Sequence, residues 1–239
     1  MIDLHSHLLP GIDDGAATLS EALELAQMAV ADGISHMVMT PHVHPGRYAN
    51  TRQSIIAELD GFRRALDEHC IPLQIYAAGE VRLCAEVLAM FAAQQLPFLG
   101  TWQGQNVLLL ELPHSHVPPG SDKLVKWLLQ RNVVVMIAHP ERNKGFLADV
   151  TRLAPFVEMG CLFQLTAMSV TGEFGQPAQS LAFEMLEKGW ATVIASDAHN
   201  HNRRPPLLSA AHESVVARLG ESEARRLFFD RPAHILGIA

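Results

Sequence analysis

Short apolar segments alternate with longer amphipathic segments along the whole chain. The short ones have the length of strands, and several, such as VLLLEL and VVVMIAH, are apolar almost without interruption. Strands that are apolar on both faces are typical of parallel sheets covered by helices. We predict seven strands, at Ile2–His5, Met37–Thr40, Leu73–Ala77, Val107–Leu110, Val133–Ala138, Leu162–Leu165 and Thr192–Ala195.

The longer segments repeat apolar residues at intervals of three and four, which is typical of helices with one buried face. Thr18 and Thr51, residues of a type that caps helices, precede two of them. We predict helices at Leu19–Ala31, Arg52–His69, Ala85–Gln94, Asp122–Gln130 (capped by Ser121), Pro177–Glu187 and Pro206–Arg218.

Strand and helix alternate at intervals of about thirty residues, and this rhythm predicts the architecture. Seven βα units fit a closed or nearly closed (β/α) barrel. A doubly wound open sheet is the alternative. No Ser/Gly-rich linker and no shift in composition divides the chain, so we predict one domain over residues 1–239.

Composition narrows the class of protein. Of the 239 residues, 49% are hydrophobic and 18% charged, which is enough apolar material for a large core. The net charge of −7 and the lack of a basic run argue against general nucleic-acid binding, but not against a local cationic pocket for a small anion. Three cysteines without CxxC spacing suit a reducing compartment. With no signal-peptide pattern and no apolar run of ~20 residues, we expect a cytoplasmic protein without membrane insertion.

Polar residues gather where the predicted strands end. One histidine or acid at a strand end is usually a hydrogen-bonded or solvated residue, but here six of the seven strand ends carry one. In a parallel barrel these ends meet at one mouth, where catalytic residues lie. The residues concerned are His5, His7, His42, His44, Glu80, Glu111, His139, Arg142, Asp197 and His199.

The types and spacing of these residues indicate a metal cluster. Residues i and i+2 of a strand face one side, so His5 with His7, and Asp197 with His199, can share a centre. Imidazole and carboxylate without thiolate favour Mn, Fe or Zn. About nine donors exceed the needs of one ion, so we expect two or three divalent ions. Three divalent ions would outweigh the negative charge of four carboxylates, those of Asp14, Glu80, Glu111 and Asp197. The excess of roughly two positive charges would suit a hydroxide and a phosphate-like substrate.

Seven motifs, in this order, resemble a known family: HxH, DDG, TPH, GxE, a strand-final Glu, AHPER and SDAHN. They are similar to those of the PHP (polymerase and histidinol phosphatase) superfamily of metal-dependent phosphoesterases. Within it, the chain most resembles the manganese-dependent tyrosine phosphatases of bacterial capsule and exopolysaccharide operons. The likeness runs from Met1 to the segment RPAHIL and implies a distorted (β/α)7 TIM-like barrel with a trinuclear site.

The resemblance also implies roles for individual residues. It assigns one ion to His5, His7, Glu80 and Asp197, a second to Glu80, Glu111 and His139, and a third to Asp14, His42 and His199. Arg142 and Arg204 match arginines that grip the phosphate. Asp13 is expected only to shape the turn before Gly15. Mn²⁺ is the expected metal, with Fe, Zn or Mg as alternatives.

A mechanism follows from this assignment. We expect that a metal-bound hydroxide would attack phosphorus in line, while the ions and the two arginines would stabilise charge on the phosphoryl oxygens. None of the cysteines lies in a CxxxxxR loop, so no phosphocysteine is expected. His44 and His116 are candidates for a general acid, and His114 lies in the same loop as His116.

The resulting hypothesis is a phosphatase that acts on phosphotyrosine in a protein, such as an autophosphorylating tyrosine kinase that controls polysaccharide export. One alternative keeps the site but takes a small phosphomonoester, such as histidinol phosphate or a nucleotide. Another is a non-catalytic metal-binding regulator. Amidohydrolase barrels also begin with HxH, but they need a lysine at a middle strand end, and no predicted strand end here carries one.

Overall fold

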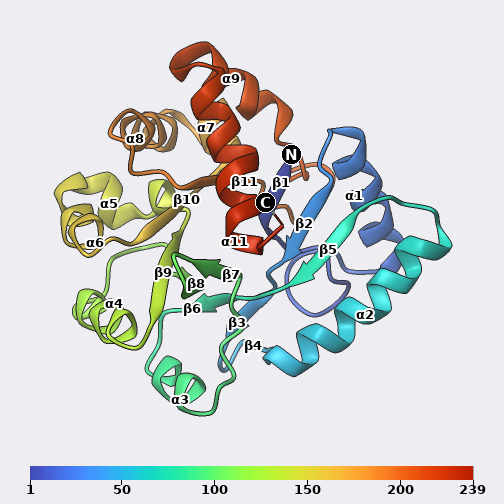
Figure 1. Cartoon of the computed structure of the whole chain (residues 1–239), viewed down its shortest axis with the longest axis horizontal. Coiled ribbons are helices and arrows are strands. Elements are labelled where there is room, and N and C mark those ends of the chain that lie inside the picture. Colours follow the sequence, from blue (N-terminus) through green and yellow to red (C-terminus); the bar gives the residue numbers. More distant parts are fainter. Residues whose placement is uncertain (239) are drawn as a thin grey trace.

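The structure, a computed structural model, describes residues 1–238. It is a mixed α/β fold in which most strands are parallel (Figure 1). The strands are β1 (Ile2–Ser6), β2 (His36–Met39), β3 (His42–His44), β4 (Tyr48–Ala49), β5 (Gln74–Ala77), β6 (Glu80–Arg82), β7 (Gly100–Trp102), β8 (Gln105–Glu111), β9 (Val133–Ala138), β10 (Leu162–Thr166) and β11 (Val193–Ala195).

Helices surround the strands (Figure 1), and none of those described is long and apolar enough to cross a membrane. The α-helices are α1 (Leu19–Ala31), α2 (Arg52–Glu68), α3 (Glu86–Ala92), α4 (Ser121–Leu129), α5 (Lys144–Ala148), α6 (Ala154–Glu158), α7 (Ala167–Thr171), α8 (Gln176–Glu187), α9 (Ser209–Leu219), α10 (Glu221–Arg225) and α11 (Arg231–Leu236). Two 3-10 turns, η1 (Pro140–Arg142) and η2 (Val150–Leu153), and a π-helical segment, η3 (Arg226–Asp230), complete the elements.

Each predicted strand and helix overlaps an observed one, and the boundaries differ by a few residues. Thr18 and Thr51 cap α1 and α2 as predicted. Ser121 does not cap α4, because it is the first residue of that helix and Gly120 precedes it. The periodic patterns missed β3, β4, β6 and β7, which have two or three residues each and are too short to show a period.

The strands form two sheets of hydrogen-bonded neighbours. One has the order β1-β2-β5, and the other the order β11-β10-β9-β8-β6-β3-β4, with β7 against β8. β3 and β6 follow β2 and β5 after short breaks, so the two sheets are joined along these strands. At the other side, His7 N donates to Ala198 O (2.8 Å) and Asp197 N to His5 O (2.8 Å). These bonds place β1 beside the segment that follows β11.

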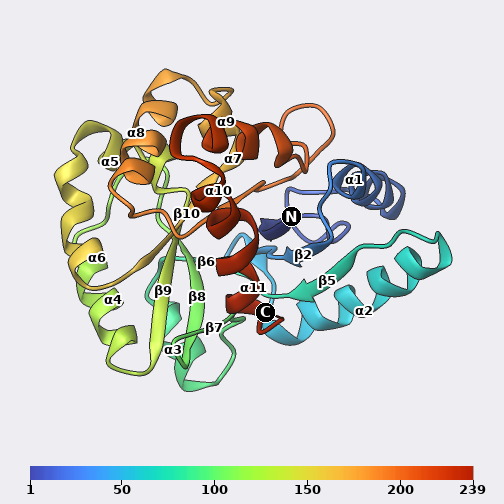
Figure 2. The same ribbon diagram turned by 45° about the horizontal axis from the view of Figure 1, so that its top comes forward.

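The two faces of the strands pack into two separate apolar clusters. Along β8, Leu108 and Leu110 belong to the larger cluster, which includes residues of the surrounding helices. Val107 and Leu109 belong to a smaller one made mostly of strand residues. The smaller cluster, called the inner cluster below, also contains Ile235 of α11. The helix α11 lies near the centre of the view in Figure 1 and packs against β7 and β1. Figure 2 shows α11 with β8 and β9 on one side and β2 and β5 on the other.

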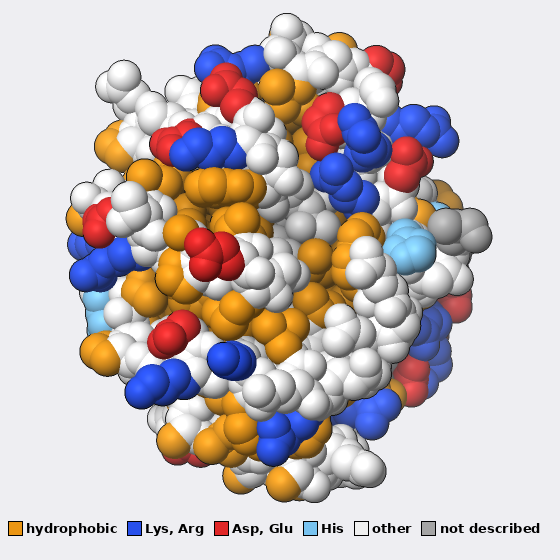
Figure 3. Space-filling view, turned by 60° about the vertical axis from the view of Figure 1, so that its left-hand side comes forward, with side chains coloured by type: hydrophobic (Ala, Val, Ile, Leu, Met, Phe, Trp, Pro, Cys, Tyr) orange, Lys and Arg blue, Asp and Glu red, His pale blue; other side chains and the backbone are white. Residues whose placement is uncertain are grey.

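The outer surface is mixed in character. On the side drawn in Figure 3, apolar side chains lie between side chains of both charge signs. Few large apolar residues are exposed, and Leu147 of α5 is one of them.

Candidate metal centre

An irregularity in β1 brings two histidines to one side. The pairing of β1 with β2 shifts register between Asp3 and Ser6. Leu4 packs in the inner cluster, and the rings of His5 and His7 also come together, with their Nε2 atoms 3.1 Å apart and both side chains fully buried. A regular strand would turn Leu4 and His5 to opposite faces, so the register shift sets the direction of both rings.

Each of these two rings is held through its other nitrogen. His5 Nδ1 lies 2.8 Å from Gln164 Oε1, and His7 Nδ1 lies 2.7 Å from Asp13 Oδ2. An acceptor at Nδ1 places the ring proton there and leaves Nε2 with its lone pair, as in most histidine–metal sites. Asp13 therefore does more than shape the turn, although it also accepts from Gly15 N. The sequence signals were the acidic doublet DDG and the lone polar residue of LFQLT.

Glu80, fully buried at the start of β6, faces four imidazole rings. Its Oε2 lies 2.8 Å from His42 Nδ1 and 3.5–3.6 Å from the Nε2 atoms of His5 and His7. Its Oε1 lies 2.9 Å from His139 Nε2. The two oxygens of Glu80 face different imidazole rings, as the oxygens of a bridging carboxylate would.

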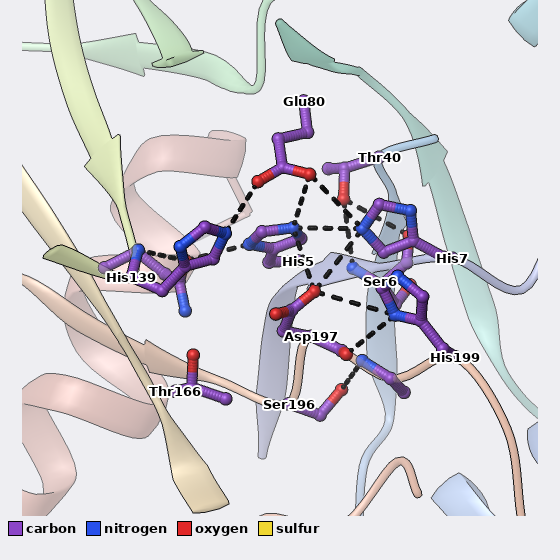
Figure 4. Close-up of polar contacts among 12 residues, drawn as sticks. His5, Ser6, His7, Thr40, Glu80, His139, Thr166, Ser196, Asp197 and His199 are labelled. Carbon is purple, nitrogen blue, oxygen red and sulfur yellow. Dashed lines mark hydrogen bonds and ion pairs between the residues drawn. The ribbon is translucent and has the colours of Figure 1, made fainter. Parts of the chain in front are cut away.

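Asp197 lies across the His5–His7 pair from Glu80 in the view of Figure 4. Its Oδ1 is 3.3 Å from His5 Nε2 and 3.4 Å from His7 Nε2. Its backbone has a φ of +54°, and His139 has a φ of +32°. Non-glycine residues rarely adopt this left-handed region, and such strain clusters at functional sites.

A further group forms around Asp14 in the loop after β1. Its Oδ1 lies 3.2 Å from His42 Nε2 and 3.8 Å from His199 Nε2. Burial and the neighbouring His7 lower the pKa of His199 to about 3, so this ring is neutral and can be a ligand. Glu111 is not part of this group; it faces His42 and Glu80 instead.

The nine predicted ligands thus fall into four overlapping groups, each with donor atoms within 4.8 Å of one another. Their membership differs in part from the expected sets, because Glu111 groups with His42 rather than with His139. The groups are His7, Asp14, His42 and His199; His5, His7 and Glu80; His5, His139 and Asp197; and His42, Glu80 and Glu111.

The electrostatics of the centre favour cations. Burial disfavours the charged form of His5, but the Asp197 and Glu80 carboxylates raise its pKa to about 9. Burial also disfavours charged His42, and Glu80 with Asp14 raises its pKa to about 11. The cationic neighbours in turn hold the pKa values of Glu80 and Asp197 well below their usual range despite burial. Positive charge is therefore stabilised here strongly enough to retain protons on imidazoles.

Buried lone-pair atoms of the centre fit a metal ion. Asp197 Oδ1 and His199 Nε2 are buried and have no hydrogen-bond partner within residues 1–238. Buried acceptors of this kind are rare in native proteins unless an ion or water meets them. The donor set of imidazoles and carboxylates suits Mn, Fe or Zn.

Both predicted arginines reach the centre through Asp197. Its Oδ2 accepts from Arg142 Nη1 (2.5 Å) and from Arg204 Nη2. The guanidinium of Arg142 also lies over the ring of Phe174, 4.4 Å from its centroid. The one carboxylate thus faces the imidazoles with Oδ1 and two guanidinium groups with Oδ2.

Several histidines lie outside the four groups. His44 of β3 is half-buried, and His114 and His116 are exposed in the loop after β8. Of the helical ones, His69 donates through Nδ1 to Ala65 O at the end of α2, and His212 packs against Phe228. These contacts agree with capping and packing roles.

The chain matches the family described as capsular polysaccharide synthesis, CpsB/CapC, over residues 1–237. It is 34% identical over 204 residues to the tyrosine-protein phosphatase YwqE of Bacillus subtilis (strain 168), which covers 85% of this chain and 79% of that protein. It is 30% identical over 208 residues to the putative tyrosine-protein phosphatase CapC of Staphylococcus aureus, with 87% and 80% covered.

Solved structures give the same likeness. Crystal structures of YwqE from Bacillus subtilis and CpsB from Streptococcus pneumoniae, described as unique metal-dependent tyrosine phosphatases, include a chain that matches with a TM-score of 0.92 and 30% identity. The match covers 100% of this chain and 95% of that one. The lactonase Lmo2620 from Listeria monocytogenes matches with a TM-score of 0.62 at 13% identity, over 98% and 94% of the two chains, and shares the fold alone.

Proposed function

The chain belongs to the capsular polysaccharide synthesis (CpsB/CapC) family, and from this premise we propose that it is a metal-dependent phosphatase that hydrolyses phosphotyrosine on proteins. The observation that carries the proposal is the position of Asp197. Its carboxylate stands between the imidazole cluster and the two guanidinium groups. An anion held by the arginines would therefore lie against the metal centre.

The nine residues His5, His7, Asp14, His42, Glu80, Glu111, His139, Asp197 and His199 are proposed to hold two or three divalent ions, Mn²⁺ first among them. Glu80 would be able to bind more than one of these ions, because its two oxygens face different imidazole rings. Bound divalent ions lower the pKa of coordinated water and offset phosphoryl charge. The three cysteines are outside these groups, which supports a centre without thiolate.

Arg142 and Arg204 have a separate task. A guanidinium offers a planar fork of donors that matches two oxygens of a phosphoryl group. Asp197 orients both forks, and Phe174 supports the face of Arg142. These side chains bind and orient the phosphoryl group and stabilise the charge that develops on its oxygens as the bond to the phenolic oxygen breaks. A phenolate leaves with little proton donation, since the pKa of tyrosine is about 10.

The substrate is proposed to be an autophosphorylating tyrosine kinase that controls polysaccharide export. Support comes from the family, which is named for capsular polysaccharide synthesis. A cytoplasmic location goes with this role, and the three free cysteines suit a reducing compartment.

Residues 1–239 are proposed to form a single domain with a distorted (β/α)7 barrel. Three observations support this. β2 with β3, and β5 with β6, act as two interrupted strands; the bonds of His7 and Asp197 connect β1 to the end of β11; and the strands enclose their own apolar cluster.

A substrate comparison tests the proposal. Purified protein is assayed for bound metal and for turnover of a phosphotyrosine peptide, a phosphoserine peptide and histidinol phosphate. We expect bound transition metal, preference for the phosphotyrosine peptide, and loss of activity with a strong chelator that is reversed by Mn²⁺. Preference for histidinol phosphate would overturn the substrate, and chelator-resistant activity would overturn the metal centre.

A further inference from the structure

One strand end supplied no candidate site residue in the sequence. β10 (Leu162–Thr166) runs beside β11, with Thr166 paired to Ala195. The strand ends on the side where its neighbours deliver His139 and Asp197. Its last residue, Thr166, is completely buried. The hydroxyl group of Thr166 is thus part of the enclosed surface of the site.

This hydroxyl has no hydrogen-bond partner among the residues that the structure describes. Thr166 Oγ1 is buried and makes no hydrogen bond within residues 1–238. In Figure 4 it points toward the space between His139 and Asp197. Buried hydroxyl groups in native proteins are nearly always hydrogen-bonded, to protein or to something bound. A donor that is kept unpaired at this place indicates a partner brought by a ligand.

The backbone around the hydroxyl is fixed to the segment that carries Arg142. Thr166 N donates to Glu141 Oε1 at 2.9 Å, and Ser169 Oγ donates to the same oxygen at 2.7 Å. Glu141 is fully buried in the short turn η1, between His139 and Arg142. The buried carboxylate therefore holds Thr166 and Arg142 in a constant relation to each other.

The charged groups of the site indicate which kind of ligand would accept a hydrogen bond from the Thr166 hydroxyl. Arg142 and Arg204 both donate to Asp197 Oδ2, so two cationic donor groups lie on the Asp197 side of the centre. A phosphoryl group has three non-bridging oxygens, and each can accept more than one hydrogen bond. Two arginines and one hydroxyl can together satisfy three such oxygens.

We propose that the Thr166 hydroxyl donates a hydrogen bond to a non-bridging oxygen of the substrate phosphoryl group. This inference rests on the proposed phosphatase function. It makes Thr166 a third phosphate-binding residue beside Arg142 and Arg204, and it gives the seventh strand end a part in the site.

The test compares Thr166→Val, which keeps the branched shape but removes the hydroxyl, with Thr166→Ser, which keeps the hydroxyl. With the metal-loaded full chain, kcat and KM for a phosphotyrosine peptide and the inhibition constant for inorganic phosphate are measured. For T166V we expect kcat/KM to fall about 10–100-fold, the usual loss for a hydrogen bond to a charged group. We expect weaker phosphate inhibition and unchanged metal content. T166S should stay within a few-fold of the parent.

Thr192→Val is the matched control. Thr192 is also buried and stands just before β11, but its hydroxyl accepts from Phe163 N at 3.2 Å, away from the site. T192V is expected to lower thermal stability while leaving phosphate affinity unchanged. If T166V behaves in the same way, with phosphate inhibition and kcat/KM intact, the hydroxyl is structural and the proposal is wrong.

A direct phosphate titration separates this inference from the proposed function. Calorimetry of the metal-loaded protein with inorganic phosphate needs no turnover. If the parent does not hydrolyse phosphotyrosine but T166V alone loses phosphate affinity, the substrate assignment fails and the role of Thr166 stands. If T166V binds phosphate like the parent, the role of Thr166 fails whatever the substrate is.

Discussion

At the scale of residues, the direction of each metal-binding imidazole nitrogen depends on the group that holds the other nitrogen of the same ring. Asp13 holds His7 through Nδ1, and Gln164 holds His5 in the same way. Asp13 Oδ2 also accepts from His42 N, so this one carboxylate links the loop after β1 to β3. Such supporting contacts fix the ring tautomer and orientation, and they commonly contribute 10–100-fold to metal affinity.

Asp13→Asn should weaken metal binding by about 10–100-fold, because an amide can donate to His7 Nδ1 and favour the tautomer with the proton on Nε2. Calorimetric titration of the metal-free protein with Mn²⁺ measures the affinity. Asp60→Asn, in an exposed ion pair with Arg63, is the control and should bind like the parent. Equal affinity in D13N and D60N would contradict a supporting role for Asp13.

Metal affinity should also rise with pH. The pKa of His5 is raised to about 9 and that of His42 to about 11 when no ion is bound, so both rings are protonated at neutral pH. A metal ion must displace these protons, and each proton released strengthens binding roughly tenfold per pH unit below the ligand pKa. Titrations with Mn²⁺ between pH 6.5 and 8.5 should show this increase, with proton release measured in buffers of different ionisation enthalpy. Affinity independent of pH would show that the imidazoles are already neutral.

At the scale of elements, α11 joins the end of the chain to the inner apolar cluster. Ile235 packs into that cluster, and His234 lies edge-on to Trp102 of β7. Gly100 of β7 approaches this helix so closely that a Cβ atom there would lie 2.0 Å from Ile235 O. The contact of β7 with α11 therefore requires a residue without a side chain.

Gly100→Ala should destabilise the fold by about 1–3 kcal/mol or more, since backbone and not a flexible side chain must move. For a chain of this size the melting temperature should fall by about 2–4 °C per kcal/mol. The control is Gly61→Ala in α2, where the nearest atom to a new Cβ is Arg64 Nη2 at 4.0 Å, and the higher helix propensity of alanine should stabilise slightly. A G100A variant with the same melting temperature as the parent would show that α11 does not pack against β7 in solution.

At the scale of the whole molecule, four of the acidic residues behind the net charge of −7 converge on one centre. Asp197 contacts β1 near the N-terminus and Arg204 in the segment before α9. Ions held at the proposed centre would therefore connect segments that are far apart in the sequence.

Metal removal should lower the melting temperature. An ion at 100 times its dissociation constant adds about 2.7 kcal/mol, which corresponds to roughly 5–10 °C here. Differential scanning calorimetry of chelator-treated protein with and without Mn²⁺ measures the increment. His69→Ala, at the end of α2, should show the same rise in melting temperature on adding Mn²⁺ as the parent. His5→Ala should lose most of that rise. An increment that survives H5A would place the stabilising ion elsewhere.

Much of this protein could be predicted from residue types and spacing alone. Alternation of apolar and amphipathic segments predicted the strands and the main helices, because burial on both faces leaves a clear signature. The recurrence of His, Asp and Glu at strand ends predicted which residues the fold brings together. Gln164 and Thr166 escaped that reasoning, because one polar residue in an apolar strand has several ordinary explanations. Asp13 escaped it because an acidic residue beside a glycine commonly just shapes a turn.

Tertiary structure decided the rest, because it depends on register and on contacts between distant segments. The sequence gives His5 and His7 a shared face, but only the shifted pairing of β1 turns that face inward beside Leu4. Likewise, no spacing shows that Asp197 meets both arginines, since the left-handed backbone at this residue is set by its neighbours in space. The residue types of the centre are local information, whereas its geometry depends on how the strands pair and pack.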